Sequence, residues 1–325
     1  MSLDDKLVFL AGATGLAGSS ILSDLLERYP TTRIRAAYYA HTAPFLDHPR
    51  VEYVYGDLRS PARCRKLLRG CDGAILAALS QGRRRGQTGA LAQASGTAVL
   101  NTQLLEACRL EQVKRVVCVG TVTLYQEFDG YIKEDQLDLN QDPHPAYRGI
   151  GWVMRFIEKL CRVYHEQAGL DILLVRSANI FGPYARFNPA TSNFIPALIR
   201  KAVDKLDPFE VWGSPEVTRD VIYSTDFGRA IAMLLERDDL QFDVFNIGSG
   251  VKTTVGQVVT WALRAAGHRP NQIKYNSDRP TTNPIRALDC AKARRVLGWE
   301  PQYTVEQGIQ LTTDWWLSNQ AWWKK

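Results

Sequence analysis

The stretch formed by residues 6–18 constrains the fold of this chain more than any other part of it. It reads KLVFLAGATGLAG, an apolar run interrupted by glycines at Gly12, Gly15 and Gly18. Residues 7–10 have the character of a buried parallel strand, and apolar residues recur at helical spacing after Leu16. A strand, a glycine turn and a helix predict a phosphate cradle, because the helix N-terminus presents backbone N–H groups to a pyrophosphate.

The spacing of these glycines is G-x-x-G-x-x-G rather than the G-x-G-x-x-G of two-domain dehydrogenases. Three glycines also fit a turn with a purely structural role. Their position between a predicted strand and a predicted helix favours a dinucleotide-binding site, and Thr14 and Leu16 belong to the same turn.

Short apolar runs alternate with helical segments along the first half of the chain. The further strands that we predict are 34–40, 51–55, 74–78, 115–119 and 172–176. Helical patterns lie between several of them, notably at 97–109 and 152–167. This alternation predicts an α/β fold with a doubly wound parallel sheet.

The sequence pattern changes at about residue 179, where prolines become frequent and the predicted helices and strands become shorter. Residues 243–247 are expected to return one strand to the sheet. We expect a dinucleotide-binding domain over 1–178 with a returning segment around 218–247. A smaller, partly discontinuous substrate-binding lobe would take 179–217 and 248–325, and a ligand cleft would lie between the two.

Charge and hydropathy restrict the partners. No apolar run reaches membrane-spanning length and no basic-then-apolar leader precedes the first strand, so we expect a cytoplasmic protein without a membrane role. The net charge of +6 suits an anionic partner. The basic residues are spread along the chain apart from Arg83, Arg84 and Arg85, which favours a small nucleotide-type molecule over nucleic acid; a merely solvated surface is the alternative.

The cysteines show neither a C-x-x-C pair nor metal-ligand spacing, so we expect reduced, mostly buried thiols and no metal site. They are Cys64, Cys71, Cys108, Cys118, Cys161 and Cys290.

Several further motifs follow in order along the chain. GDL follows the third predicted strand, GTVTLY the fifth and SANIFGP the sixth, and RDVIYSTD comes later. In this order they resemble the extended short-chain dehydrogenases/reductases of the NAD-dependent epimerase/dehydratase group, which act on nucleotide sugars. The resemblance runs from the first strand to Trp316. Within the group, the segments SNFIPALIRKA and VWGSPEVTRDVIYSTD are most similar to GDP-fucose synthases.

The resemblance implies that the glycine turn holds NAD or NADP. The positions that it assigns to the adenosine half of the cofactor are Asp57, Leu58, Ala77 and Ala78. The second strand ends in YYAH, which offers no Asp for a ribose 2′-OH and no Arg obviously placed for a 2′-phosphate. His41, or Arg35 in a shifted register, could meet a phosphate, so the choice between NAD and NADP stays open.

The catalytic positions depart from the family pattern. A typical member uses a Ser or Thr, a Tyr-x-x-x-Lys pair and the nicotinamide to move a proton and a hydride. Thr121 takes the Ser/Thr position. Anchoring the next helix on its EKLC segment puts Ile150 and Met154 at the Tyr and Lys positions, and neither can move a proton. Tyr147 lies one turn earlier and is either a replacement acid or a capping or surface aromatic.

The residues that two other reactions of this family require are also missing from the matching positions of this chain. Dehydratases carry acidic residues just after the Thr, where this chain has Val122 and Thr123. GDP-fucose synthases use a Cys and a His, and the matching positions here are Thr123 and Asn193. We therefore expect either a rewired set of acid and base groups, with Thr121, Thr123 and Tyr147 as candidates, or a cofactor that no longer reacts.

The substrate side of the resemblance is better preserved. It implies binding of a nucleotide-diphosphate sugar or a similar anionic small molecule, because guanidinium groups donate paired hydrogen bonds to a diphosphate. The positions concerned are Asn179, Asn193, Lys201, Trp212, Arg219 and Arg279.

Three functions follow from these patterns. The first is an enzyme that epimerises or reduces a nucleotide-linked sugar with NAD(P). The second is a catalytically silent member that binds dinucleotide as a sensor or scaffold. The third is a related enzyme that acts on another small molecule.

A homodimer is also implied by the resemblance, through the predicted helices 97–109 and 152–167. Leu100, Leu104, Phe156 and Leu160 are the candidate contacts, and burial against the sheet is the competing explanation for the same apolar stripe.

Overall fold

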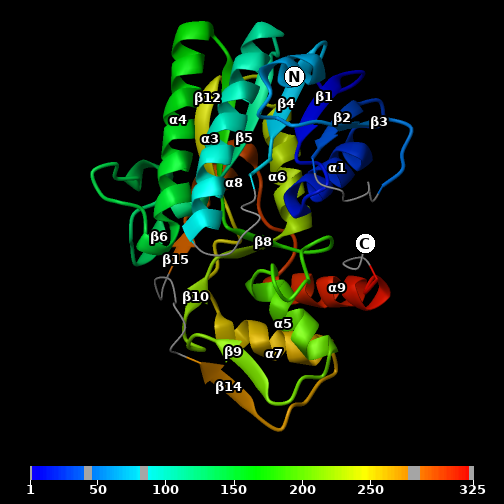
Figure 1. Cartoon of the computed structure of the whole chain (residues 1–325), viewed down its shortest axis with the longest axis vertical. Helices are drawn as coiled ribbons and strands as arrows, with labels where there is room; N and C mark the ends of the chain where they lie inside the picture. Colours follow the sequence, from blue (N-terminus) through cyan, green and yellow to red (C-terminus); the bar gives the residue numbers. More distant parts are fainter. Residues whose placement is uncertain (1, 40–45, 81–86, 277–285, 322–325) are drawn as a thin grey trace.

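A seven-stranded parallel sheet forms the centre of the larger part of the molecule (Figure 1). The computed structural model describes residues 2–39, 46–80, 87–276 and 286–321. In sheet order the strands are β12 (Phe242–Ile247), β7 (Asp171–Ser177), β5 (Arg115–Thr121), β4 (Gly73–Leu76), β1 (Leu7–Ala11), β2 (Arg33–Tyr38) and β3 (Val51–Tyr55). The sheet reverses its order of growth beside β1, which is the arrangement of a doubly wound fold.

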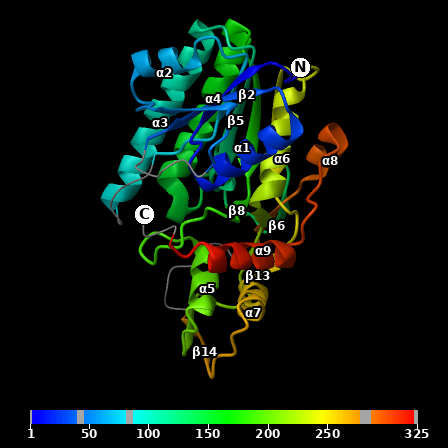
Figure 2. The same cartoon turned by 90° about the vertical axis from the view of Figure 1, so that its right-hand side faces the viewer.

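Helices cover both faces of this sheet. Figure 2 shows one group on one side and another group on the other. The first group contains α2 (Pro61–Leu68), α3 (Gln87–Leu110) and α4 (Arg148–Ala168), and the second contains α1 (Leu16–Arg28) and α6 (Ser224–Glu236). The central strands β1 and β4 are almost continuously apolar because both of their faces are buried, whereas no residue of the edge strand β3 is fully buried.

A smaller group of elements lies beyond the carboxyl ends of the strands and has its own hydrophobic cluster (Figure 1). In this cluster the ring of Phe187 stacks on Trp316, with ring centres 4.1 Å apart. Its helices are α5 (Phe194–Val203), α7 (Val255–Ala265) and α9 (Val305–Ser318). Its strand pairs are β8 (Asn179–Phe181) with β11 (Val221–Tyr223), β9 (Phe209–Trp212) with β14 (Ile273–Asn276) and β10 (Thr218–Arg219) with β13 (Thr253–Thr254).

Three short elements complete the described fold. Strands β6 (Gly130–Ile132) and β15 (Arg286–Leu288) pair in parallel, and α8 (Ala291–Leu297) packs against β12. Trp299, just after α8, is fully buried in the cluster of the main sheet. Part of the range that the sequence analysis gave to the smaller lobe therefore packs with the sheet. No helix in the described ranges is long and apolar enough to cross a membrane.

Most of the strand predictions are confirmed, including the return of residues 243–247 as β12. The cysteines are all free and buried, as expected. The candidate dimer contacts need a correction. Leu100 and Leu104 are 6% and 0% exposed and pack in the main cluster, so burial against the sheet explains them. Phe156, by contrast, is 48% exposed on α4.

A buried ion pair joins α4 to the sheet. Glu158 accepts two hydrogen bonds of 2.8 Å from Arg176, a residue of β7. Arg176 also donates to the hydroxyl of Tyr125 at 2.8 Å, and this hydroxyl donates to Asn246 of β12. The network orients α4, whose N-terminal turns carry Ile150 and Met154, against the strands that end at the ligand-binding edge.

Replacing Glu158 with Gln should destabilise the fold strongly, because it leaves the buried guanidinium of Arg176 without its counter-charge. We expect a loss of about 3–5 kcal/mol in the free energy of unfolding, measured by urea denaturation. The control is Glu52→Gln, which removes an exposed partner of Arg35 and should cost less than about 1 kcal/mol. Equal effects of the two substitutions would contradict the structural role of the pair.

Candidate functional site

The glycine turn between β1 and α1 has the geometry that the sequence predicts. Gly12 has φ of +80°, and a Cβ there would stand 3.0 Å from the carbonyl oxygen of Ala77 and from the Cα of Ala78. A Cβ on Gly18 would lie 2.1 Å from the carbonyl oxygen of Gly12. The turn therefore tolerates no side chain at either glycine, and it brings Ala77 and Ala78 beside Gly12.

The first turn of α1 is suited to an anion. Gly15 is its N-cap residue and supplies no side-chain hydrogen bond to the backbone N–H groups of that turn. The partial positive charge of the helix N-terminus and these N–H groups fit a pyrophosphate. Leu16, the next residue, packs against the cluster of the smaller lobe, so the turn also borders that lobe.

The predicted adenosine end lies where β2 and β3 finish. The N–H groups of Gly12 and Ala13 both donate to the carbonyl oxygen of Ala37, each at 3.1 Å. Asp57 follows β3 and forms an ion pair with Arg59, which donates its Nη2 at 2.6 Å. The hydrogen bonds from Arg59 lower the pKa of Asp57. Leu58 is 8% exposed and packs in the main cluster.

Two hydroxyl groups meet at the end of β5. The Oγ atoms of Thr121 and Thr123 are 2.5 Å apart, and the Thr121 hydroxyl also accepts a hydrogen bond from the Thr123 N–H at 3.0 Å. Both residues are half-buried. The pair can donate to and accept from a carbonyl or hydroxyl group, but neither threonine acts as a strong acid or base.

The helix positions assigned to the missing Tyr-x-x-x-Lys pair are apolar. Met154 is 2% exposed, and its sulfur would lie 3.9 Å from a Cβ built on Gly120, the residue before Thr121. The side chain at position 154 therefore faces the end of β5, as the alignment predicts. Ile150, one turn earlier, is half-buried. Neither side chain can transfer a proton.

Tyr147 is the N-cap residue of α4, but its side chain forms no capping hydrogen bond with that helix. It is half-buried, and its ring lies 6.0 Å from the ring of His144. His144 is within 3.3 Å of Glu127. Tyr147 thus occupies the N-cap position without a capping hydrogen bond from its side chain, and the catalytic role and the surface-aromatic role are both left as hypotheses.

One surface pocket contains two of the predicted substrate residues and Val122, which follows β5. Val122, which lies between the two threonines, lines it together with Asn179 and Arg219. The remaining lining residues are Asp220, Ala287 and Leu288. The structure therefore brings Asn179 and Arg219 together with the end of β5, although they come from separate parts of the chain.

Hydrogen bonds of the buried Asp220 connect the chain segments around this pocket. Its carboxylate is 6% exposed and accepts hydrogen bonds from the Ser249 N–H and hydroxyl, both at 2.9 Å, and from the Leu288 N–H at 3.0 Å. Burial raises the pKa of Asp220 to about 6, even though these bonds favour the charged form. Arg219 is fixed beside it and donates its Nη1 to the carbonyl oxygen of Thr218 at 2.8 Å.

The other predicted substrate residues do not line this pocket. Asn193 is the exposed N-cap residue of α5. Lys201 donates to the carbonyl oxygen of Glu210 at 2.7 Å, and burial lowers its pKa. Trp212 is 61% exposed at the end of β9. Arg279, His41 and the arginines 83–85 lie outside the described residues.

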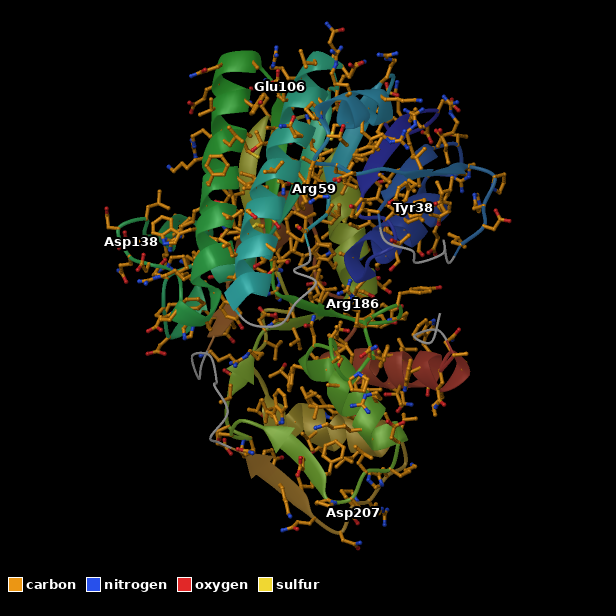
Figure 3. All side chains as sticks on the ribbon, in the orientation of Figure 1. Tyr38, Arg59, Glu106, Asp138, Arg186 and Asp207 are labelled. Carbon is orange, nitrogen blue, oxygen red and sulfur yellow. The ribbon has the colours of Figure 1, made fainter. Side chains whose placement is uncertain are left out.

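Sequence reasoning missed two arginines near the ligand-binding edge. The Arg59 guanidinium donates a hydrogen bond to Tyr39, just after the end of β2. The sequence signal that could have identified this arginine is its position two residues after Asp57. Arg186 lies on the loop between β8 and α5 and is labelled in Figure 3 between the sheet-containing part and the smaller lobe. No described residue pairs with its guanidinium, and partial burial lowers its pKa. Within the described ranges, no group of three His, Cys, Asp or Glu is placed to hold a metal ion.

The doubly wound sheet and the glycine turn indicate a dinucleotide-binding protein, and comparison with known proteins supports this class. The model of the NAD dependent epimerase/dehydratase family matches residues 8–248. The chain belongs to this family of nucleotide-sugar epimerases, dehydratases and reductases, an enzymatic family that uses a nicotinamide dinucleotide.

Three individual proteins illustrate the similarity. The low-salt glycan biosynthesis protein Agl12 of Haloferax volcanii is 30% identical over 320 residues, which cover 96% of this chain and 99% of that protein. GDP-L-fucose synthase 1 of Arabidopsis thaliana is 25% identical, over 98% of this chain and 96% of that protein. The structure of MoeE5 in complex with UDP-glucuronic acid and NAD is 25% identical and superposes with a TM-score of 0.83, covering 96% and 99% of the two chains.

Replacing Gly15 with Val should abolish dinucleotide binding without unfolding the protein. A Cβ at this position meets only the Gly12 carbonyl oxygen at 3.3 Å, but the branched side chain would occupy the space in front of the α1 N-terminus. Because each lost charge-assisted hydrogen bond weakens binding by roughly ten- to hundredfold, calorimetry should show at least that loss. Gly149→Ala on α4 is the control and should bind normally; wild-type affinity in Gly15→Val would contradict the cradle.

Proposed function

We propose that this protein binds NAD(P) and a nucleotide-diphosphate sugar together and epimerises or reduces the sugar. The observation that supports the proposal is the pocket lined by Asn179, Arg219 and Val122, the residue between Thr121 and Thr123 in the sequence. An arginine suits a diphosphate and an asparagine suits sugar hydroxyls. Both line the pocket with Val122, just after β5, and β4 separates β5 from β1 in the sheet. MoeE5, a similar protein, was solved with UDP-glucuronic acid, which supports this substrate class.

A bound nicotinamide would supply the site that accepts and returns a hydride. In our proposal the Thr121 and Thr123 hydroxyls orient the substrate oxygen, and Arg219 and Asn179 hold the diphosphate and sugar. Tyr147 is the proposed proton donor and acceptor. Position 151, where the lysine of a Tyr-x-x-x-Lys pair starting at Tyr147 would stand, is a glycine, so we expect slow turnover.

A silent dinucleotide-binding protein is the second candidate. The buried Met154 favours it, because the site next to Gly120 holds an apolar side chain where a typical member of the group has a cation. Turnover separates the two candidates, since both would retain cofactor binding.

The experiment is to incubate the full chain with NAD(P) and a panel of nucleotide-diphosphate sugars and to follow the sugars by NMR. Tyr147→Phe should lower the rate by roughly 10²–10⁴-fold if Tyr147 moves the proton. Tyr164→Phe on the same helix, whose hydroxyl bonds Glu106, is the matched control and should leave the rate unchanged. Turnover that survives Tyr147→Phe would refute the role of Tyr147, and a complete lack of turnover with intact cofactor binding would favour the silent protein.

We also propose that the chain forms a homodimer through the outer faces of α3 and α4. The two helices lie side by side, and the apolar residues on their outer faces are at least 41% exposed in the single chain (Figure 1). These residues are Leu91, Val99, Trp152, Phe156 and Val163. Helix pairs with such faces associate into four-helix bundles.

Phe156→Glu should convert the protein to a monomer at micromolar concentration, because it places a charge in the centre of the proposed seam. Sedimentation velocity is the measurement. Leu317→Glu on α9, where the leucine is 50% exposed, is the control and should keep the dimer. A wild-type protein that sediments as a monomer would remove the proposal.

A further inference from the structure

The end of β2 carries no carboxylate. Tyr38 is the last residue of this strand, and its carbonyl oxygen accepts a hydrogen bond of 3.0 Å from the N–H of Gly56. The preceding residue, Ala37, receives the two N–H groups of the glycine turn. Tyr38 therefore lies between the turn and the start of the Gly56–Asp57 segment. In a doubly wound fold, an acidic residue in this neighbourhood hydrogen-bonds the ribose 2′-OH of NAD, whereas an arginine nearby accommodates a 2′-phosphate.

Arg59 extends its guanidinium over this strand end. Its Nη2 donates to the Tyr39 hydroxyl at 3.2 Å, and its Cζ lies 5.7 Å from the centre of the Tyr39 ring. The Tyr39 ring in turn stacks on Tyr55, with centres 5.9 Å apart and planes inclined by 16°. Tyr38 and Arg59 are both labelled on the sheet-containing part in Figure 3. The two tyrosine rings form a platform that limits where the guanidinium can go.

Asp57 fixes one edge of the Arg59 guanidinium and leaves another edge open. Its oxygens accept from Nε at 2.9 Å and from Nη2 at 2.6 Å, whereas Nη1 hydrogen-bonds no described residue. The side chain of Arg59 is 51% exposed, so an incoming anion can reach it. A guanidinium held in this way can receive a phosphate oxygen without first losing rotamer freedom.

The charges around this strand end add up to a cationic site. Arg63 of α2 donates to the carbonyl oxygen of Tyr55, and its Nε would lie 2.7 Å from a Cβ on Gly56. The negative charge of Asp57 balances the positive charge of Arg59, and the positive charge of Arg63 remains. Arg35, the alternative named from the sequence, is excluded because it bonds Glu52 and the carbonyl oxygens of Leu67 and Arg69.

We propose that the protein takes NADP(H) in preference to NAD(H), and that Arg59, held by Asp57 against Tyr39, binds the 2′-phosphate of its adenosine ribose. The proposal rests on the dinucleotide site of the proposed function and adds which dinucleotide fills it. It departs from the similar MoeE5 structure, which was solved with NAD.

The test is calorimetric titration of the full-length protein with NADP⁺, NAD⁺, adenosine 2′,5′-bisphosphate and 5′-AMP. NADP⁺ should bind at least about tenfold more tightly than NAD⁺, and the bisphosphate more tightly than 5′-AMP. Arg59→Gln should weaken NADP⁺ binding by about ten- to hundredfold and change NAD⁺ binding by less than about threefold. Arg59→Lys should retain part of the preference.

Arg65→Gln is the matched control, since Arg65 lies on α2 and pairs with Glu111 away from this site. It should leave both affinities unchanged. Equal or tighter binding of NAD⁺ by the wild type overturns the proposal, and so does an equal loss of both cofactors in Arg59→Gln. A wild type that binds none of the four molecules refutes the dinucleotide site itself, which distinguishes failure of the proposed function from failure of the 2′-phosphate assignment.

Discussion

The contact between the backbone of Gly12 and the end of β4 is the constraint on which the ligand-binding edge depends. With φ of +80° and the Ala77 carbonyl oxygen 3.0 Å from where a Cβ would stand, only glycine allows β1 to turn this close to its neighbour. The N–H groups of Gly12 and Ala13 donate to the carbonyl oxygen of Ala37, and α1 begins at Leu16, four residues after Gly12. One small residue thus sets the separation between two strands and the direction of a helix.

The pocket that contains Asn179 and Arg219 depends on a buried carboxylate rather than on a glycine. Asp220 joins the end of β10, the loop after β12 and the strand β15, which are far apart in sequence. Because backbone N–H groups and the Ser249 hydroxyl fix the Asp220 carboxylate, the backbone at the neighbouring Arg219, which lines the pocket with Val122, is held by contacts within the protein. The proposed cofactor side and the proposed substrate side are therefore both held in place by contacts within the protein, by different physical means.

The sequence predicted what periodicity and local chemistry determine. The buried strands, the glycine turn and the return of residues 243–247 to the sheet follow from short apolar runs and from glycine spacing. Where a helix carries apolar residues on more than one face, the spacing of these residues does not predict which of them are buried. Leu104 and Phe156 both fit an apolar stripe, yet one packs on the sheet and the other faces outward. Which side of α3 or α4 meets the sheet depends on tertiary packing that a single sequence does not display.

Side-chain partners were the other part that sequence reasoning could not supply. Asp57 was assigned from a motif, but its ion pair with Arg59 depends on how the chain turns after β3. Asp220 belongs to the RDVIYSTD motif, but the sequence alone does not indicate its role, because its partners at 249 and 288 are distant in sequence. Residues that act locally can be assigned from sequence, whereas those that act across the fold require coordinates.

The burial of Met154 has a consequence for how such a site can change over evolutionary time. A lysine substituted at this position alone would bring a cation into the place of a side chain that is 2% exposed and whose thioether packs beside Gly120. The desolvation of that charge would oppose folding unless an acceptor arrived with it. The packing of the core around position 154 thus favours an apolar side chain independently of any reaction.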